Sequence, residues 1–249
     1  TLLKESMIKN PQSKVFLGFN RSSSKTFNEL RKLVSNESGF ITAHCNMSVN
    51  GTPATNELRK LVSSDPGFIN TNYKMPPNES SVTKNMTYTD YKILDHLCHF
   101  TDLILRLIPP DKAFPCEIIP EEMPVNKSTL EFSFSIVFAD KSHVSFNHKE
   151  IPNLLEGMDE SIELSKGNLI AKLSNFQKLQ IELRGKIINT KSLYRDHGHE
   201  SSIKEAFVST IDNIGYGESI QHIVATSKLY LKIAEAMNKM ASTEVFLDK

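Results

Sequence analysis

The chain has 249 residues, 39% of them hydrophobic, which is enough for a real core in one large domain or two small ones. Its 29 basic residues balance 29 acidic ones, and this neutrality excludes a protein drawn to nucleic acid or acidic membranes by its overall charge. No stretch is apolar over the roughly 20 residues that a membrane-spanning helix needs. The three cysteines, Cys45, Cys98 and Cys116, lack paired spacing and predict free thiols. We therefore expect an intracellular protein, in the cytoplasm or nucleus.

The first feature along the chain is a duplicated peptide. Residues 28–35 recur unchanged at 56–63, and a Gly-Phe-Ile tripeptide follows each copy, at 39–41 and 67–69. Two copies of a 28-residue repeat are too few for a stacked solenoid, and each amphipathic helix is too short to be stable alone. We interpret the copies as docking peptides. The residues predicted to bind a partner are Leu30, Leu33, Val34, Phe40, Leu58, Leu61, Val62 and Phe68. Ser35 and Ser63 follow basic pairs and are possible regulatory phosphorylation sites.

The composition changes near residue 86. Residues 1–86 are rich in Ser, Asn, Thr, Gly and Pro, which predicts a loop-rich arm, whereas 87–249 have strong periodic patterns and predict a folded domain. The first half also carries seven Asn-x-Ser/Thr sequons, which would suit a secreted glycoprotein. The sequons begin at Asn20, Asn36, Asn46, Asn50, Asn78, Asn85 and Asn126.

In the second half, the apolar spacing predicts a helix over 90–108, which the prolines at 109 and 110 end. Residues 130–136 alternate strictly between apolar and polar, and with a turn at 139–142 and a return strand at 144–146 they predict one β-hairpin.

The remaining patterns favour helices. A capping box at 147–150 predicts a helix to about residue 162, and others are predicted over 202–211 and 218–241. The spacing of residues 169–187 favours an amphipathic helix, with a coiled coil as the alternative. The predicted fold is thus α+β, mainly α: a helical domain with one hairpin near 130–146, preceded by the loop-rich arm.

Histidines provide the best metal-ligand candidates. His96, Cys98 and His99 lie close together, and His197 and His199 could complete a tetrahedral set, although the spacing matches no zinc motif. We favour ordinary core or surface histidines and predict no metal.

Other catalytic motifs are absent from the sequence. Gly215-Tyr-Gly217 fails the dinucleotide pattern, because Ile220 stands where the third glycine belongs. The carboxylates at 159, 160 and 163 resemble the solvated face of a helix. We find no acid/base or nucleophile set, and therefore predict no enzyme and no cofactor.

These observations favour a non-catalytic adaptor subunit that binds other protein subunits, with no direct nucleic-acid partner and no membrane span. The alternative is a secreted glycoprotein that binds a ligand or receptor. An enzyme with an unfamiliar site at His96 and His99 ranks third.

Overall fold

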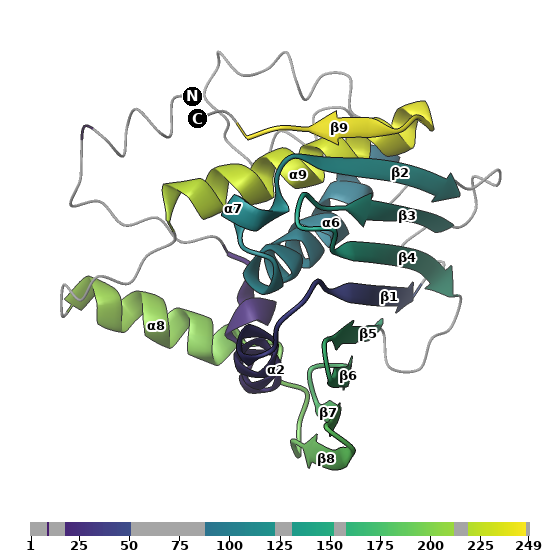
Figure 1. Cartoon of the computed structure of the whole chain (residues 1–249). Coiled ribbons are helices and arrows are strands. Elements are labelled where there is room, and N and C mark those ends of the chain that lie inside the picture. Colours follow the sequence, from purple (N-terminus) through teal and green to yellow (C-terminus); the bar gives the residue numbers. More distant parts are fainter. Residues whose placement is uncertain are drawn as a thin grey trace.

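The computed structural model of the chain describes residue 9 and residues 18–50, 88–122, 131–151, 158–211 and 219–247. Within these residues, nine strands form one sheet, and helices pack on one of its faces (Figure 1). The strands are β1 (Thr42–Asn50), β2 (Cys116–Glu122), β3 (Glu131–Val137), β4 (His143–Ile151), β5 (Met158–Lys166), β6 (Leu169–Ser174), β7 (Lys178–Leu183), β8 (Lys186–Lys191) and β9 (Thr243–Val245).

The sheet is mixed, with the strand order β8-β7-β6-β5-β1-β4-β3-β2-β9. β1 and β4 are parallel, and the other neighbouring strands are antiparallel. This arrangement differs from a doubly wound sheet, in which most strands are parallel.

The helical elements are η1 (Asn20–Ser23), α2 (Lys25–Asn36), α6 (Tyr88–Leu107), α7 (Pro110–Ala113), α8 (His199–Ile211) and α9 (Ile220–Lys239). α2 contacts β6 and β7, while α6 packs against α9, and α9 against β2. Among the described helices, none is both long and apolar enough to cross a membrane.

The core lies between the helices and the sheet, as the alternation of β3 predicts. Phe132, Phe134 and Ile136 point to the helices and are buried. Phe134 faces Phe146 of β4 across the predicted hairpin, and the ring of Phe100 from α6 lies 4.4 Å from that of Phe146, centroid to centroid. Fully buried aromatic clusters of this kind contribute strongly to stability.

The prediction of a mainly helical fold is wrong, because two segments predicted as helices are strands. The segment after Asn147 continues β4 and then forms β5, and residues 169–187 form β6, β7 and the start of β8. The turns between these last strands hold Asn175, Phe176, Arg184 and Gly185 at positive φ, which no helix tolerates. The coiled coil is excluded for the same reason.

The first copy of the duplicated peptide is part of this core. Ser24 caps α2 by accepting a hydrogen bond from the Phe27 N–H, and α2 buries Leu30 and Val34. Residues 42–50 of the predicted arm form β1, in the middle of the sheet between β4 and β5. The predicted domain boundary at 86/87 and the second copy at 56–63 lie outside the described residues.

Candidate functional site

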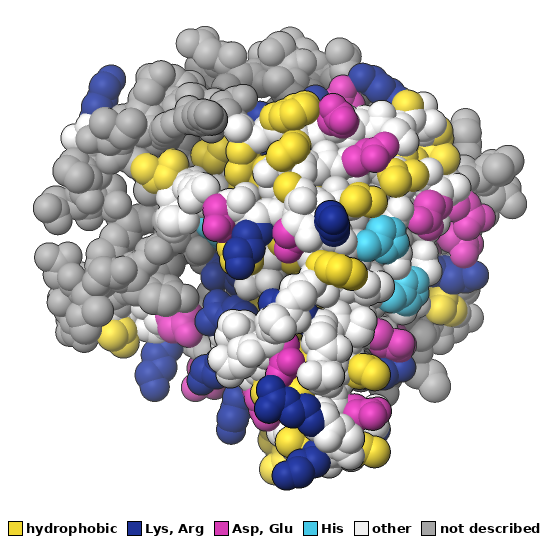
Figure 2. Space-filling view, viewed as in Figure 1, with side chains coloured by type: hydrophobic (Ala, Val, Ile, Leu, Met, Phe, Trp, Pro, Cys, Tyr) yellow, Lys and Arg dark blue, Asp and Glu magenta, His cyan; other side chains and the backbone are white. Residues whose placement is uncertain are grey.

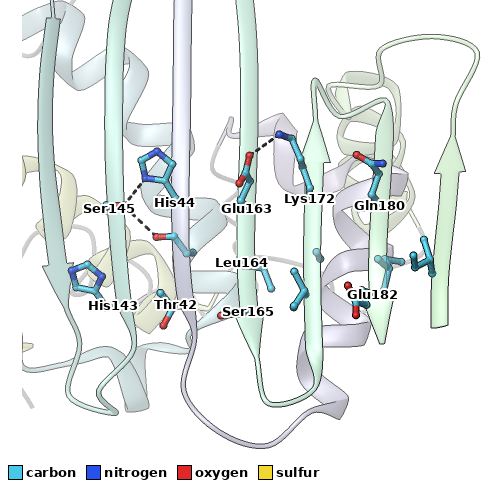
Figure 3. Close-up of a pocket in the computed structure, with 15 residues that line it drawn as sticks. Thr42, His44, His143, Ser145, Glu163, Leu164, Ser165, Lys172, Gln180 and Glu182 are labelled. Carbon is cyan, nitrogen blue, oxygen red and sulfur yellow. Dashed lines mark hydrogen bonds and ion pairs between the residues drawn. The ribbon is translucent and has the colours of Figure 1, made fainter. Parts of the chain in front are cut away.

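A large hollow lies on the face of the sheet that no described helix covers (Figure 3). It has a volume of about 720 Å³, and its polar side chains come from alternate positions of neighbouring strands. Lys172 donates to Glu163 over 2.6 Å, and His44 Nδ1 lies 2.7 Å from the Ser145 hydroxyl. Both members of the Glu163–Lys172 pair are half exposed, and such ion pairs contribute little to stability. Figure 2 shows charges of both signs mixed with apolar side chains over the visible surface.

Buried charge is found instead on the helix side, where η1 meets β5. Arg21 Nε donates to Glu160 Oε1 over 2.7 Å, and the two side chains are only 9% and 8% exposed. Arg21 Nη2 also lies 3.2 Å from the Met158 sulfur. The Glu160 backbone is fixed by Asn175, whose side-chain oxygen accepts from the Glu160 N–H at 2.8 Å. Burying a charge costs free energy unless the charge is paired. Arg21 and Glu160 therefore depend on each other to stay buried.

The loop before α8 closes over this pair. The Asn20 side-chain amide donates to the His197 carbonyl at 2.6 Å and to His199 Nε2 at 3.1 Å. Asp196 accepts from the N–H groups of Gly198 and Lys25, which ties the loop to the start of α2. Gly198 has φ +78°, and a Cβ there would collide with the Asn20 carbonyl oxygen. Only glycine permits this close approach.

His99 projects from α6 into the same region. Its ring packs edge-on against Phe19, with centroids 5.6 Å apart. Burial and the positive charge of Arg21 lower the pKa of His99 from 6.5 to about 4, although the Asp102 carboxylate opposes this. Burial also lowers the pKa of His197, against the opposing effect of Glu160. His99 is therefore neutral at physiological pH.

Asp102 lies one turn after His99 and is fully buried. His222 of α9 reaches it with an Nε2–Oδ1 distance of 2.8 Å, and Arg106 donates to it at 3.1 Å. Burial acts to raise the pKa of Asp102, but the hydrogen bond from His222 and the charge of Arg106 outweigh it, so the pKa lies below its usual value. The carboxylate is thus ionised, and it fixes α6 against α9.

We call Asn20, Arg21, His99, Glu160, His197 and His199 the His99 cluster. Within it, the buried atoms His99 Nδ1, Glu160 Oε2 and His197 Nε2 have no hydrogen-bond partner among the described residues. A cavity of about 30 Å³ is lined in part by Arg21, His99 and Glu160, which is room for about two water molecules. The described residues contain no group of three or more His, Cys, Asp or Glu side chains that could hold a metal ion.

Some of the predicted metal-ligand candidates do come together. His99, His197 and His199 all belong to the cluster, and the charges of His197 and His199 act on His99. Cys98 on α6 is half-buried and forms no disulfide, and nothing is described of the His96 side chain.

The predicted partner-binding residues divide three ways. Leu30 and Val34 are core residues and Leu33 packs against the core, so they are not a docking face; Phe40 is exposed. Ser35 is exposed and donates to the Lys32 carbonyl. Those of the second copy lie outside the described residues: Leu58, Leu61, Val62, Ser63 and Phe68.

Sequence reasoning missed half of the cluster. Asn20 was noticed only as a sequon, yet it is buried and hydrogen-bonded, so it offers no accessible amide for a glycan. Glu160 was assigned to a solvated helix face, whereas it is buried on β5. Arg21 carried no local signal. Asp102 and Arg106, four residues apart on a predicted helix, were the one pair that spacing could have identified.

Comparison with known proteins finds matches among solved structures alone. No protein-family model matches the chain, and no curated protein matches its sequence. Solved structures do match: a dehydrogenase (MviM) from Clostridium difficile has a TM-score of 0.63 at 15% identity, covering 94% of this chain and 66% of that one. GenD2 from gentamicin A biosynthesis, in complex with NAD, has 0.61 at 11%, covering 92% and 63%. A scyllo-inositol dehydrogenase from Lactobacillus casei has 0.60 at 13%, covering 96% and 66%.

These matches overturn the adaptor prediction. The chain shares its fold with dehydrogenases, so the predictions of a non-catalytic adaptor, of no enzyme, and of a helical scaffold are wrong. The chain spans slightly less than two thirds of the length of these three structures.

The residues present do not fit a dinucleotide. The sequence has no G-x-G-x-x-G pattern, which would form a glycine-rich turn. Such a turn, followed by a helix N-terminus, is what holds the pyrophosphate in dinucleotide-binding folds.

Proposed function

We propose that this chain provides the substrate-binding and proton-transfer side of an oxidoreductase that acts on a polyhydroxylated small molecule. The observation that carries the proposal is the neutral His99, which lines a cavity together with the Arg21–Glu160 pair. The fold shared with dehydrogenases, one of them a scyllo-inositol dehydrogenase, supports the reaction class and the polyol.

Oxidation of a secondary alcohol removes a proton from oxygen and a hydride from carbon. We assign the proton to His99, because its imidazole is uncharged and lines the cavity beside Arg21 and Glu160. Asp102, ionised one turn away, stabilises the imidazolium that forms. Arg21 places a guanidinium with several N–H donors beside it for hydroxyl oxygens. The hydride acceptor is not assigned to the described residues.

A binding experiment tests the proposal without any hydride acceptor. The purified chain is titrated with scyllo-inositol and with other cyclic polyols, while the imidazole C–H signals of selectively labelled histidine are followed by NMR. We expect at least one polyol to shift the His99 signals and to leave His143, on the opposite face of the sheet, unchanged.

The matched variants are His99→Gln and His143→Gln. His99→Gln should weaken polyol binding, and in the assembled enzyme it should lower turnover by about 10²- to 10⁴-fold, the usual contribution of a general base. His143→Gln should leave both unchanged. A panel of polyols that shifts no signal of the His99 cluster, or that shifts His143 instead, would overturn the proposal.

A further inference from the structure

The cavity beside His99 is small, and most of its described lining is apolar. Its volume of about 30 Å³ is room for about two water molecules and far too little for a cyclic polyol. Water occupies a cavity of this size where polar groups face it. Its described lining includes Arg21, His99 and Glu160 together with the aromatic side chains of Phe100, Phe146 and Phe176. The polar part of this lining therefore belongs to the His99 cluster, and it suits water.

Two of these lining residues carry a buried polar atom that has no hydrogen-bond partner among the described residues. The atoms are His99 Nδ1 and Glu160 Oε2. The other carboxylate oxygen, Glu160 Oε1, already accepts from Arg21 Nε at 2.7 Å, so Oε2 is the acceptor that is left. A water between Oε2 and Nδ1 would satisfy both atoms. Holding one water costs less free energy than leaving two buried polar atoms unsatisfied.

We infer that Glu160 sets the tautomer of His99 through a water in this cavity, with the ring hydrogen on Nδ1; this rests on the proposed function. The carboxylate paired with Arg21 only accepts hydrogen bonds, so the water turns a hydrogen toward Glu160 and a lone pair toward Nδ1. The bond made by one imidazole nitrogen decides which nitrogen carries the hydrogen. Nδ1 of the neutral ring is therefore the N–H, and Nε2 keeps the lone pair.

This tautomer makes Nε2 the basic atom of the proposed reaction. His99 is half-buried but its Nδ1 is buried, so a substrate cannot reach Nδ1. The proton of a substrate hydroxyl goes to Nε2, while Nδ1 retains its own hydrogen, and no proton has to cross the cavity. Glu160 touches the substrate at no point of this step. It is a positioning residue that acts through His99.

His197 is the competing partner for Glu160. Its Nε2 lies 3.8 Å from Glu160 Oε2, which is beyond hydrogen-bond distance, and His197 is not among the described residues that line the cavity. Asn20 holds the His197 carbonyl at 2.6 Å, and the His197 ring packs edge-on against Phe176 with centroids 5.8 Å apart. His197→Gln is therefore the matched control, because it changes a histidine beside Glu160 outside the cavity.

The test reads the His99 tautomer by NMR, from correlations between the imidazole nitrogens and the ring C–H protons of ¹⁵N-labelled histidine. We expect the Nδ1–H form in the native chain at neutral pH, with His99→Gln identifying the signals. Arg21→Met with Glu160→Met replaces the ion pair by apolar side chains, which a folded protein often tolerates. This double variant should lower the ratio of the Nδ1–H to the Nε2–H form at least about tenfold, and His197→Gln should change it less than about twofold. A crystal structure of the native chain should show a water within about 3.2 Å of both Nδ1 and Oε2.

Three results would overturn the inference: an Nε2–H tautomer in the native chain, an unchanged ratio in the folded double variant, or a crystal structure with no water between the two atoms. Circular dichroism checks that each variant has folded. The tautomer is measured without substrate, so its failure would leave polyol binding at His99 untouched. If the tautomer depends on Glu160 while no polyol binds at His99, the proposed function alone fails, and the placement of the hydrogen stands.

Discussion

Removing one member of the Arg21–Glu160 pair should strongly destabilise the chain. The two side chains meet at 2.7 Å, are about nine-tenths buried, and join η1 to β5 across 139 residues of sequence. Leaving one buried charge unpaired costs about 3–5 kcal/mol, whereas an exposed pair contributes about 0–1 kcal/mol. We therefore expect Arg21→Met and Glu160→Gln each to lower the free energy of unfolding by about 3 kcal/mol or more. The double variant should lose less than the sum, since no ion is then left alone.

The assay is urea unfolding followed by circular dichroism, with both single variants and the double variant fitted at a common slope. The control is Lys172→Met with Glu163→Gln, a pair with an equally short contact of 2.6 Å whose side chains are each 48% exposed. If Arg21→Met lowered the free energy of unfolding no more than Lys172→Met does, the Arg21–Glu160 pair would contribute no more than an exposed pair, and the argument from burial would be wrong.

Three further predictions concern the loop, the core and pH. Gly198→Ala should destabilise the chain more than Gly185→Ala. Both glycines have positive φ, which costs an alanine about 1–2 kcal/mol, but only the Gly198 variant would also collide with the Asn20 backbone. Urea unfolding measures the difference in the free energy of unfolding. Phe134→Ala should cost about 3–5 kcal/mol, and Val137→Ala, on the exposed face, far less in the same assay. Because the pKa of His99 falls from 6.5 to about 4 on folding, its contribution to stability is complete above about pH 6.5 and is lost progressively as the pH falls to about 4. His99→Gln should therefore flatten the stability profile of the native chain between those pH values.

The strand β3 could be predicted because its alternation is local and complete. Residues 169–187 were misread for an instructive reason. Leu169 and Leu173 fit a heptad, but they equally fit a strand that also buries Ala171, and β7 repeats this with Leu179 and Ile181. The heptad interpretation left out the buried residues Ala171, Leu179 and Ile181, and it included Ile187, which is 73% exposed. Short strands joined by tight turns place apolar residues three and four positions apart as well as two. Asn175 and Gly185 are the turn signals that distinguish strands from a helix here.

The site could not be predicted in the same way, since no part of it is local. Asn20 and His197 are 177 residues apart, and Arg21 and Glu160 are 139 apart. They meet because α2 packs on β6, the neighbour of β5, which brings η1 to Glu160, and because Gly198 lets the loop before α8 approach η1. The parallel pairing of β1 with β4, across about a hundred residues of chain, is the step that pattern reasoning could not foresee.

The Arg21–Glu160 pair distinguishes a structural role from a chemical one. A buried ion pair is rarely required for stability, because well-packed apolar residues often replace it at no cost. Arg21 does have an electrostatic consequence, since its charge is the largest effect after burial that lowers the pKa of His99. Arg21→Met should therefore raise the His99 pKa from about 4 toward 6.5, measured by NMR titration of its imidazole protons in a variant that remains folded. If the pair were purely structural, the pKa of His99 would not change in folded Arg21→Met. Such a result would mean that Arg21 does not set the charge state of the proposed base.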